Sequence, residues 1–125
     1  MQGYRNLEIW QNAMKLTKLT YNLLNVLPKE EKYALADQMR RAAISIPSNI
    51  AEGHSRHNDN EFLQFLRYAQ GSRSELETQF ELAVELGYFS REQTLEVFTL
   101  LDNLSKGIYK LAVKIIADNK DRKQK

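Results

Sequence analysis

The chain has 125 residues, of which 42% are hydrophobic and 27% are charged, and it contains no cysteine. This length fits a single domain, and this composition is typical of a folded, helix-rich protein rather than a disordered one. The lack of cysteine excludes a disulfide framework and a thiolate metal site, and we expect a cytoplasmic protein. The N-terminal stretch mixes charges with apolar residues, so we expect neither a signal peptide nor a membrane span.

Two amphipathic helices are predicted in the first half of the chain. Apolar residues recur at spacings of three and four over about residues 7–27, which predicts a helix closed by Pro28. A second stripe covers residues 35–50 and ends near Gly53, which we interpret as a C-terminal cap. Because proline removes a backbone hydrogen bond inside a helix, we expect this second helix to be kinked at Pro47.

Two further helices are predicted in the second half, each opened by a capping-box pattern. Asn58 followed by Glu61 opens a third helix, which continues to Gly87, a residue that readily takes the left-handed conformation that ends helices. Ser90 followed by Gln93 has the same spacing and opens a fourth helix. Four such helices joined by short loops can bury their apolar stripes only as antiparallel neighbours. The sequence therefore predicts an all-α, antiparallel up-down-up-down four-helix bundle.

The predicted bundle domain covers residues 1–119 and is followed by a flexible basic tail at 120–125. Inside the third helix, Gly71 and Ser72 make a narrow point, where we expect a neighbouring helix to approach closely.

The stretch RRAAISIPSNIAEG, at residues 40–53, is distinctive, and three further stretches accompany it: LEIWQNAMKL, LPKEEKYALADQMRRA and LRYAQGSRSELETQFELAVELGY. Together they resemble the bacterial four-helix-bundle family encoded in 23S ribosomal RNA intervening sequences. The resemblance implies a homo-oligomer, in the form of a pentameric ring. It also implies similarity to the accessory protein of diversity-generating retroelements, which associates with nucleic acid and a reverse transcriptase. The family name records a genomic location and establishes no ribosomal function.

The charges are unevenly distributed between the two ends of the predicted bundle. The end that holds both chain termini gathers nine basic and six acidic residues, whereas the other end gathers three basic and six acidic ones. A distribution of this kind orients a polyanion toward the basic end, although the formal net charge is only +2. The candidate nucleic-acid-binding residues are Arg41, Arg56, Arg67, Lys110, Lys114, Lys120, Arg122 and Lys123.

Two like-charged stripes with a spacing of four residues lie on the last two helices. They are formed by Glu77, Glu81 and Glu85 and by Lys106, Lys110 and Lys114. An antiparallel register places Glu81 opposite Val97 and far from Lys110, so the stripes cannot pair along their length within one chain. One or both stripes therefore face another subunit or a charged ligand, unless they are simply solvated faces. The candidate oligomer-interface residues are Glu77, Glu81, Glu85 and Lys106.

Other candidate sites are weaker. His54 and His57 could form a metal or acid–base site, but a polar loop of this composition is more simply a capped turn, so we predict no metal and no cofactor. One of the adjacent residues Arg40 and Arg41 could order an interface, or it could pair with Asp37 or with an acid on a neighbouring helix. Tyr68 beside Arg67 is a candidate for stacking on a base.

We therefore expect no enzyme. The leading hypothesis is a non-catalytic cytoplasmic oligomer that binds nucleic acid, RNA above all, or a nucleoprotein partner through its basic end. The alternative is a homo-oligomeric protein-interaction scaffold that binds no nucleic acid. We expect no membrane partner.

Overall fold

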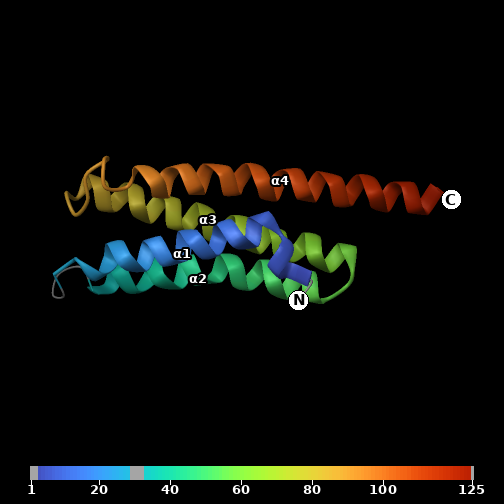
Figure 1. Cartoon of the computed structure of the whole chain (residues 1–125), viewed down its shortest axis with the longest axis horizontal. Coiled ribbons are helices and arrows are strands. Elements are labelled where there is room, and N and C mark those ends of the chain that lie inside the picture. Colours follow the sequence, from blue (N-terminus) through green and yellow to red (C-terminus); the bar gives the residue numbers. More distant parts are fainter. Residues whose placement is uncertain (1–2, 29–32, 125) are drawn as a thin grey trace.

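The computed structural model describes residues 3–28 and 33–124, which form four long α-helices after one short 3-10 helix (Figure 1). This part of the chain contains no β-strand. The elements are η1 (Gly3–Asn6), α1 (Glu8–Asn25), α2 (Tyr33–Ser55), α3 (Asp59–Glu85) and α4 (Leu95–Gln124). Within these described residues, none of the helices has a stretch long and apolar enough to cross a membrane.

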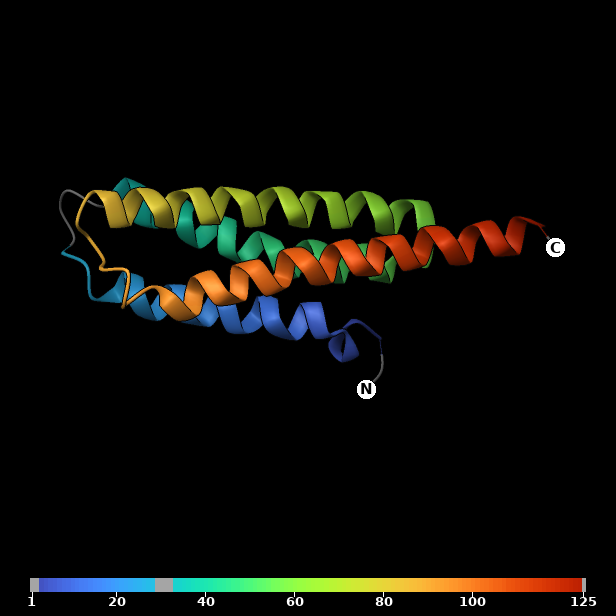
Figure 2. The same cartoon turned by 90° about the horizontal axis from the view of Figure 1, so that it is seen from above.

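The four helices pack side by side along a common direction (Figures 1 and 2). On α2 and α3, the hydroxyls of Ser45 and Ser72 lie 2.8 Å apart. On α3 and α4, the side-chain amide of Gln70 donates to the backbone carbonyl of Ser105 at 3.3 Å. Successive helices run in opposite directions in both views. The predicted all-α four-helix bundle is confirmed.

The core is built from the apolar stripes that the sequence pattern predicts, because each helix buries one face against its neighbours. Fully burying a leucine or phenylalanine side chain stabilises the fold by about 1.5 to 3 kcal/mol. The largest fully buried apolar side chains are Leu16, Met39, Ile46, Ile50, Leu66, Leu76, Phe80, Val97, Leu101 and Leu104.

Two glycines other than Gly71 lie at close contacts between helices. A Cβ atom on Gly53 would lie 2.5 Å from Cβ of Phe65, and one on Gly107 would lie 2.9 Å from Cγ2 of Ile9. The predicted close approach at Gly71 and Ser72 is found at Ser72, whose hydroxyl lies 2.8 Å from that of Ser45 on α2, but not at Gly71, which is exposed and has no such neighbour within 4 Å. The interpretation of Gly53 as a helix cap is also wrong, because α2 continues past it to Ser55.

The predicted capping patterns at Asn58 and Ser90 and the predicted end of α3 at Gly87 are confirmed, although α4 begins only at Leu95, after a turn at residues 91–94. Oδ1 of Asn58 accepts a hydrogen bond from the backbone N–H of Glu61 at 3.0 Å. The backbone N–H of Ser90 donates to Oε1 of Gln93 at 2.8 Å, and Gln93 N–H donates back to Ser90 Oγ at 3.0 Å. Gly87, with φ of +81°, lies just after α3. These bonds satisfy backbone donors that a helix start leaves free.

α4 extends beyond the boundary that we predicted for the bundle, since residues 120–124 are helical and continue past the ends of the other helices (Figure 2). Two features favour a helix here over an irregular tail. Arg122 and Lys123 lie in the last turn, where positive charge interacts favourably with the helix dipole. Arg122 also pairs with Asp59 at the start of α3. Residue 125 lies outside the described residues.

Candidate nucleic-acid interface

A groove of about 800 Å³ runs between α4 and the start of α1. Because α1 and α4 come close at Gly107 and Ile9, the floor of the groove is closed by the helices themselves. Its lining residues are Leu7, Glu8, Ile9, Asn12, Asn103, Lys106, Gly107, Lys110, Leu111 and Lys114. The groove therefore combines three basic side chains with one acidic side chain, that of Glu8, and with amide and apolar side chains.

Three lysines of α4 make one wall of this groove. A spacing of four residues places Lys106, Lys110 and Lys114 on one face of α4, over about 12 Å along the axis. Nζ of Lys106 lies 3.0 Å from Oδ2 of Asp102, in an exposed pair. Among the residues that the structure describes, Lys110 and Lys114 have no ion-pair partner. These two charges are free to bind an external anion.

The opposite side of the groove is largely apolar. Ile9 is buried, and Leu7 and Leu111 are partly buried against the core. Asn12 and Asn103 add side-chain amides, which can donate hydrogen bonds to phosphate or sugar oxygens.

Two arginines of the predicted basic end are neutralised within the chain. Nη2 of Arg56 lies 2.7 Å from Oε2 of Glu52, and its Nη1 lies 3.4 Å from Oε1 of Glu61. The hydrogen bond that the Arg56 guanidinium donates to Glu52 raises the pKa of Arg56. Arg122 is likewise paired with Asp59. These two arginines are therefore poorer candidates for phosphate binding than the lysines of the groove.

The remaining predicted basic residues lie apart from the groove. Nε of Arg41 lies 3.1 Å from Oδ2 of Asp37, which is the pairing that we considered as the alternative to an interface. Arg67 donates to Oε1 of Gln64 at 3.1 Å. Lys120 is exposed on the protruding part of α4. Lys123 lines a small polar hollow of about 310 Å³ near the start of α3.

The acidic stripe of α3 finds partners inside the chain. Oε1 and Oε2 of Glu81 lie 3.0 Å and 2.7 Å from the two guanidinium NH groups of Arg91. This hydrogen bonding lowers the pKa of the Glu81 carboxyl. Oε1 of Glu77 lies 3.1 Å from Nη1 of Arg73. Glu85 is exposed, and its charge helps to raise the pKa of Arg91. The role of the stripe in an oligomer stays a prediction.

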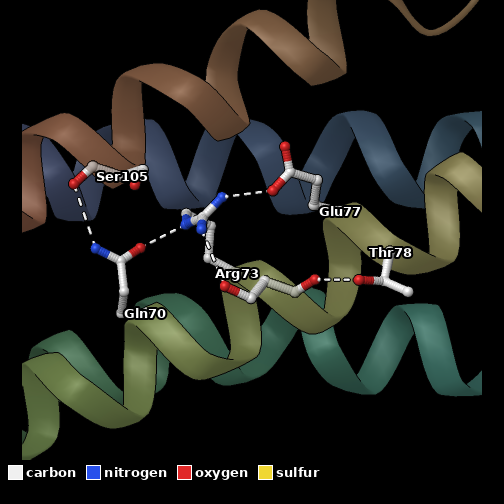
Figure 3. A network of polar contacts seen from close by, with 6 residues as sticks. Gln70, Arg73, Glu77, Thr78 and Ser105 are labelled. Carbon is white, nitrogen blue, oxygen red and sulfur yellow. Dashed lines mark hydrogen bonds and ion pairs between the residues drawn. The ribbon is translucent and has the colours of Figure 1, made fainter.

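A polar network at the α3–α4 contact is a feature that we did not predict (Figure 3). Arg73 has a side chain that is only 10% exposed, and it donates to Gln70, Ser74 and Glu77. Gln70 in turn bonds the carbonyl of Ser105 on α4. The available signal was an arginine on the apolar period of α3. We interpret the network as structural, since it joins two helices.

Two exposed tyrosines are candidates for stacking on a base, and the role predicted for Tyr68 stays a prediction. Tyr68 is 49% exposed, its hydroxyl accepts a hydrogen bond from Gln64 at 2.9 Å, and its ring packs edge-on against Phe65. Tyr109 is 70% exposed and lies between Lys106 and Lys110 in the sequence. We did not single out Tyr109, although a tyrosine next to lysines of a stripe was a readable signal.

The two histidines form a ring cluster. The imidazole of His54 packs edge-on against the ring of Phe62, with 5.6 Å between the ring centroids. The ring centroids of His54 and His57 lie 6.3 Å apart. In the described ranges 3–28 and 33–124, no three His, Cys, Asp or Glu side chains are placed to hold a metal ion.

Comparisons with known proteins place the chain among known sequences. The family model of the 23S rRNA-intervening sequence proteins matches residues 5–110. The fold is similar to that of a protein with unknown function from the S23 ribosomal protein family of Bacteroides thetaiotaomicron VPI-5482. The two are 23% identical, the TM-score is 0.77, and the similarity covers 83% of this chain and 97% of that one. No curated protein matches the chain.

Proposed function

The chain belongs to the 23S rRNA-intervening sequence protein family, and from this premise and the charges on α4 we propose that it is a non-catalytic protein that binds nucleic acid, in particular RNA. The groove between α1 and α4 is the contact surface. The observation that carries the proposal is the pair Lys110 and Lys114, which line the groove and have no ion-pair partner among the described residues. Free lysines aligned on one helix face bind successive phosphates without the cost of breaking an existing pair.

Lys106 and the two amides of the groove support the same function, and together the three lysines outnumber the one carboxylate there, that of Glu8. Lys106 exchanges its exposed pair with Asp102 for a phosphate at little cost, because surface ion pairs contribute less than about 1 kcal/mol. The amides of Asn12 and Asn103 hold the sugar and phosphate in place. Outside the groove, Arg67 and Lys120 extend the positive surface, whereas Arg56, Arg122 and Arg41 contribute less because they are paired.

The salt dependence of the affinity for RNA tests this proposal. The full chain and a Lys110→Gln/Lys114→Gln variant are titrated with labelled RNA at about 50 mM and about 200 mM salt. The variant should bind more weakly, and its log–log salt slope should be shallower by about 1.4, because each phosphate of a single strand contributes about 0.7 to that slope. A Lys15→Gln/Lys18→Gln variant removes two exposed lysines of α1 outside the groove and is the matched control. Equal weakening in both variants would contradict a site at the groove.

A second candidate function is a homo-oligomeric scaffold, in a pentameric ring as the family resemblance implies. The observation that favours it is an exposed apolar strip on the outer face of α4. Tyr109, Val113 and Ile116 are 70%, 47% and 44% exposed. Sedimentation should give a mass above that of one 14.6 kDa chain, and Val113→Glu/Ile116→Glu should reduce it to the monomer. A reverse transcriptase is a candidate partner of such an assembly.

A further inference from the structure

We propose that the lysine face of α4 prefers single-stranded nucleic acid over a duplex, because it places an exposed aromatic ring and an apolar floor on the two sides of one row of lysines. This inference rests on the proposed function and specifies its ligand. A single strand presents both phosphates and the faces of unpaired bases, whereas a duplex presents phosphates and keeps the faces of its bases stacked inside.

Tyr109 provides the aromatic surface on one side of the lysines. Its side chain is 70% exposed, and the structure assigns it neither a ring contact nor a side-chain hydrogen bond within the described ranges. Tyr68, by contrast, is engaged with Gln64 and Phe65. A free ring on a rigid helix is a platform on which a base stacks without displacing a protein contact.

Charge and ring are close enough to act on one ligand. Lys106 lies one helical turn before Tyr109, and Lys110 follows it directly. Side chains three residues apart on a helix are surface neighbours. A nucleotide whose base stacks on Tyr109 therefore has its phosphate within reach of Lys106 or Lys110.

The other side of the lysine row offers a second surface for bases. Leu7 and Leu111 line the groove between α1 and α4, and Lys110 and Lys114 form its basic wall. Unpaired bases are flat and largely apolar on their faces, so they fit an apolar floor beside a basic wall. A duplex bound to the same lysines would leave both this floor and Tyr109 without a partner.

Fluorescence anisotropy with matched ligands tests the preference. The full chain is titrated with a labelled uridine strand of about 16 nucleotides, near the upper range of single-strand site sizes, and with an RNA duplex of the same length. The single strand should bind more tightly, although the duplex carries the higher charge density. Tyr109→Ala should weaken single-strand binding about fivefold or more and leave duplex binding unchanged, while Tyr109→Phe should retain the affinity. Tyr68→Ala is the control for an exposed tyrosine elsewhere.

The outcomes separate this inference from the proposed function. Duplex binding equal to or tighter than single-strand binding would overturn the preference and leave nucleic-acid binding standing. Absence of binding to either ligand would overturn both. Unchanged single-strand affinity in Tyr109→Ala would overturn the stacking interaction. Polyglutamate is added as a competitor that carries negative charge but no bases. If it displaces the labelled single strand as effectively as an unlabelled uridine strand does, charge alone is recognised and the preference is overturned.

Discussion

The hydroxyl of Thr17 on α1 lies 3.0 Å from the backbone carbonyl oxygen of Ala43 on α2 and 2.8 Å from that of Ala13 on its own helix, so its one proton is shared between the two carbonyls. In an uninterrupted helix this carbonyl would accept the N–H of the residue at position 47. That residue is Pro47, which has no N–H. The neighbouring helix therefore supplies a shared donor for the carbonyl that the proline leaves free.

Replacing Thr17 should expose the cost of this arrangement. Ala43 is fully buried, and a buried carbonyl without a donor costs about 1 to 3 kcal/mol. Thr17→Val keeps the shape of the side chain but removes the hydroxyl, so we expect a loss of stability in this range. Urea denaturation measures it. An unchanged midpoint would show that the carbonyl has another donor.

A double-mutant cycle with Pro47→Ala tests the link between the two residues. Alanine at position 47 restores the N–H, so Thr17→Val should cost less in the Pro47→Ala background than in the natural chain. Thr20→Val is the control, because the Thr20 hydroxyl donates within its own helix, to the carbonyl of Leu16, at 2.8 Å. Its cost should be the same in both backgrounds. The bend that we predict at Pro47 can be checked in the same variant, where the axis of α2 should straighten.

The close contact between α2 and α3 should make Gly53 intolerant of a larger residue. In Gly53→Ala the new methyl group would lie 2.5 Å from Cβ of Phe65, which is attached to the backbone and cannot rotate away. We expect a loss of about 1 to 3 kcal/mol, as in other overpacked cores. Gly71→Ala is the matched control on an exposed helix face, and should instead stabilise by about 0.5 to 1 kcal/mol. Thermal unfolding measures the stability of both variants. Equal changes in stability in Gly53→Ala and Gly71→Ala would contradict the close contact at Gly53.

The buried Arg73 predicts an asymmetry between two substitutions. In Glu77→Gln the guanidinium stays buried and loses its counter-charge, which should cost about 1 to 3 kcal/mol. In Arg73→Met the remaining Glu77 is 44% exposed and can be hydrated, while methionine fills the apolar space. We therefore expect Arg73→Met to be the milder change in chemical denaturation. The reverse order would show that Arg73 is held mainly by Gln70 and Ser74.

Features that depend on neighbours along the chain could be predicted from the sequence, and features that depend on distant neighbours could not. The capping boxes at Asn58 and Ser90 are local, so their spacing was sufficient. The role of Gly53 depends on which residue of α3 faces it, and no local pattern contains that information. The same holds for the site, where Arg122 is neutralised by an aspartate 63 residues away.

In the candidate site, a local signal was also present and was missed. Glu52 and Arg56 are four residues apart on one helix, a spacing that favours an ion pair. This spacing by itself indicates that part of the predicted basic end is neutralised. The lysine stripe of α4 was predicted from its period, but its position in a groove depends on the packing of α1 against Gly107.

The pair of Arg91 and Glu81 predicts how stability depends on pH. The two hydrogen bonds from Arg91 lower the pKa of the Glu81 carboxyl, an effect that burial partly opposes. A carboxyl whose pKa is lower in the folded than in the unfolded state stabilises the fold above its unfolded-state pKa. This contribution is lost as the pH falls through the folded-state pKa, when the carboxylate becomes protonated.

Arg91→Ala should therefore raise the pKa of Glu81 toward its ordinary value, which NMR titration of the carboxyl measures. The difference in stability between the natural chain and the variant should shrink in acid. Arg91→Lys keeps the charge but not the two-pronged geometry, so its Glu81 pKa should lie between the other two. A Glu81 pKa that is the same in all three proteins would contradict the pair.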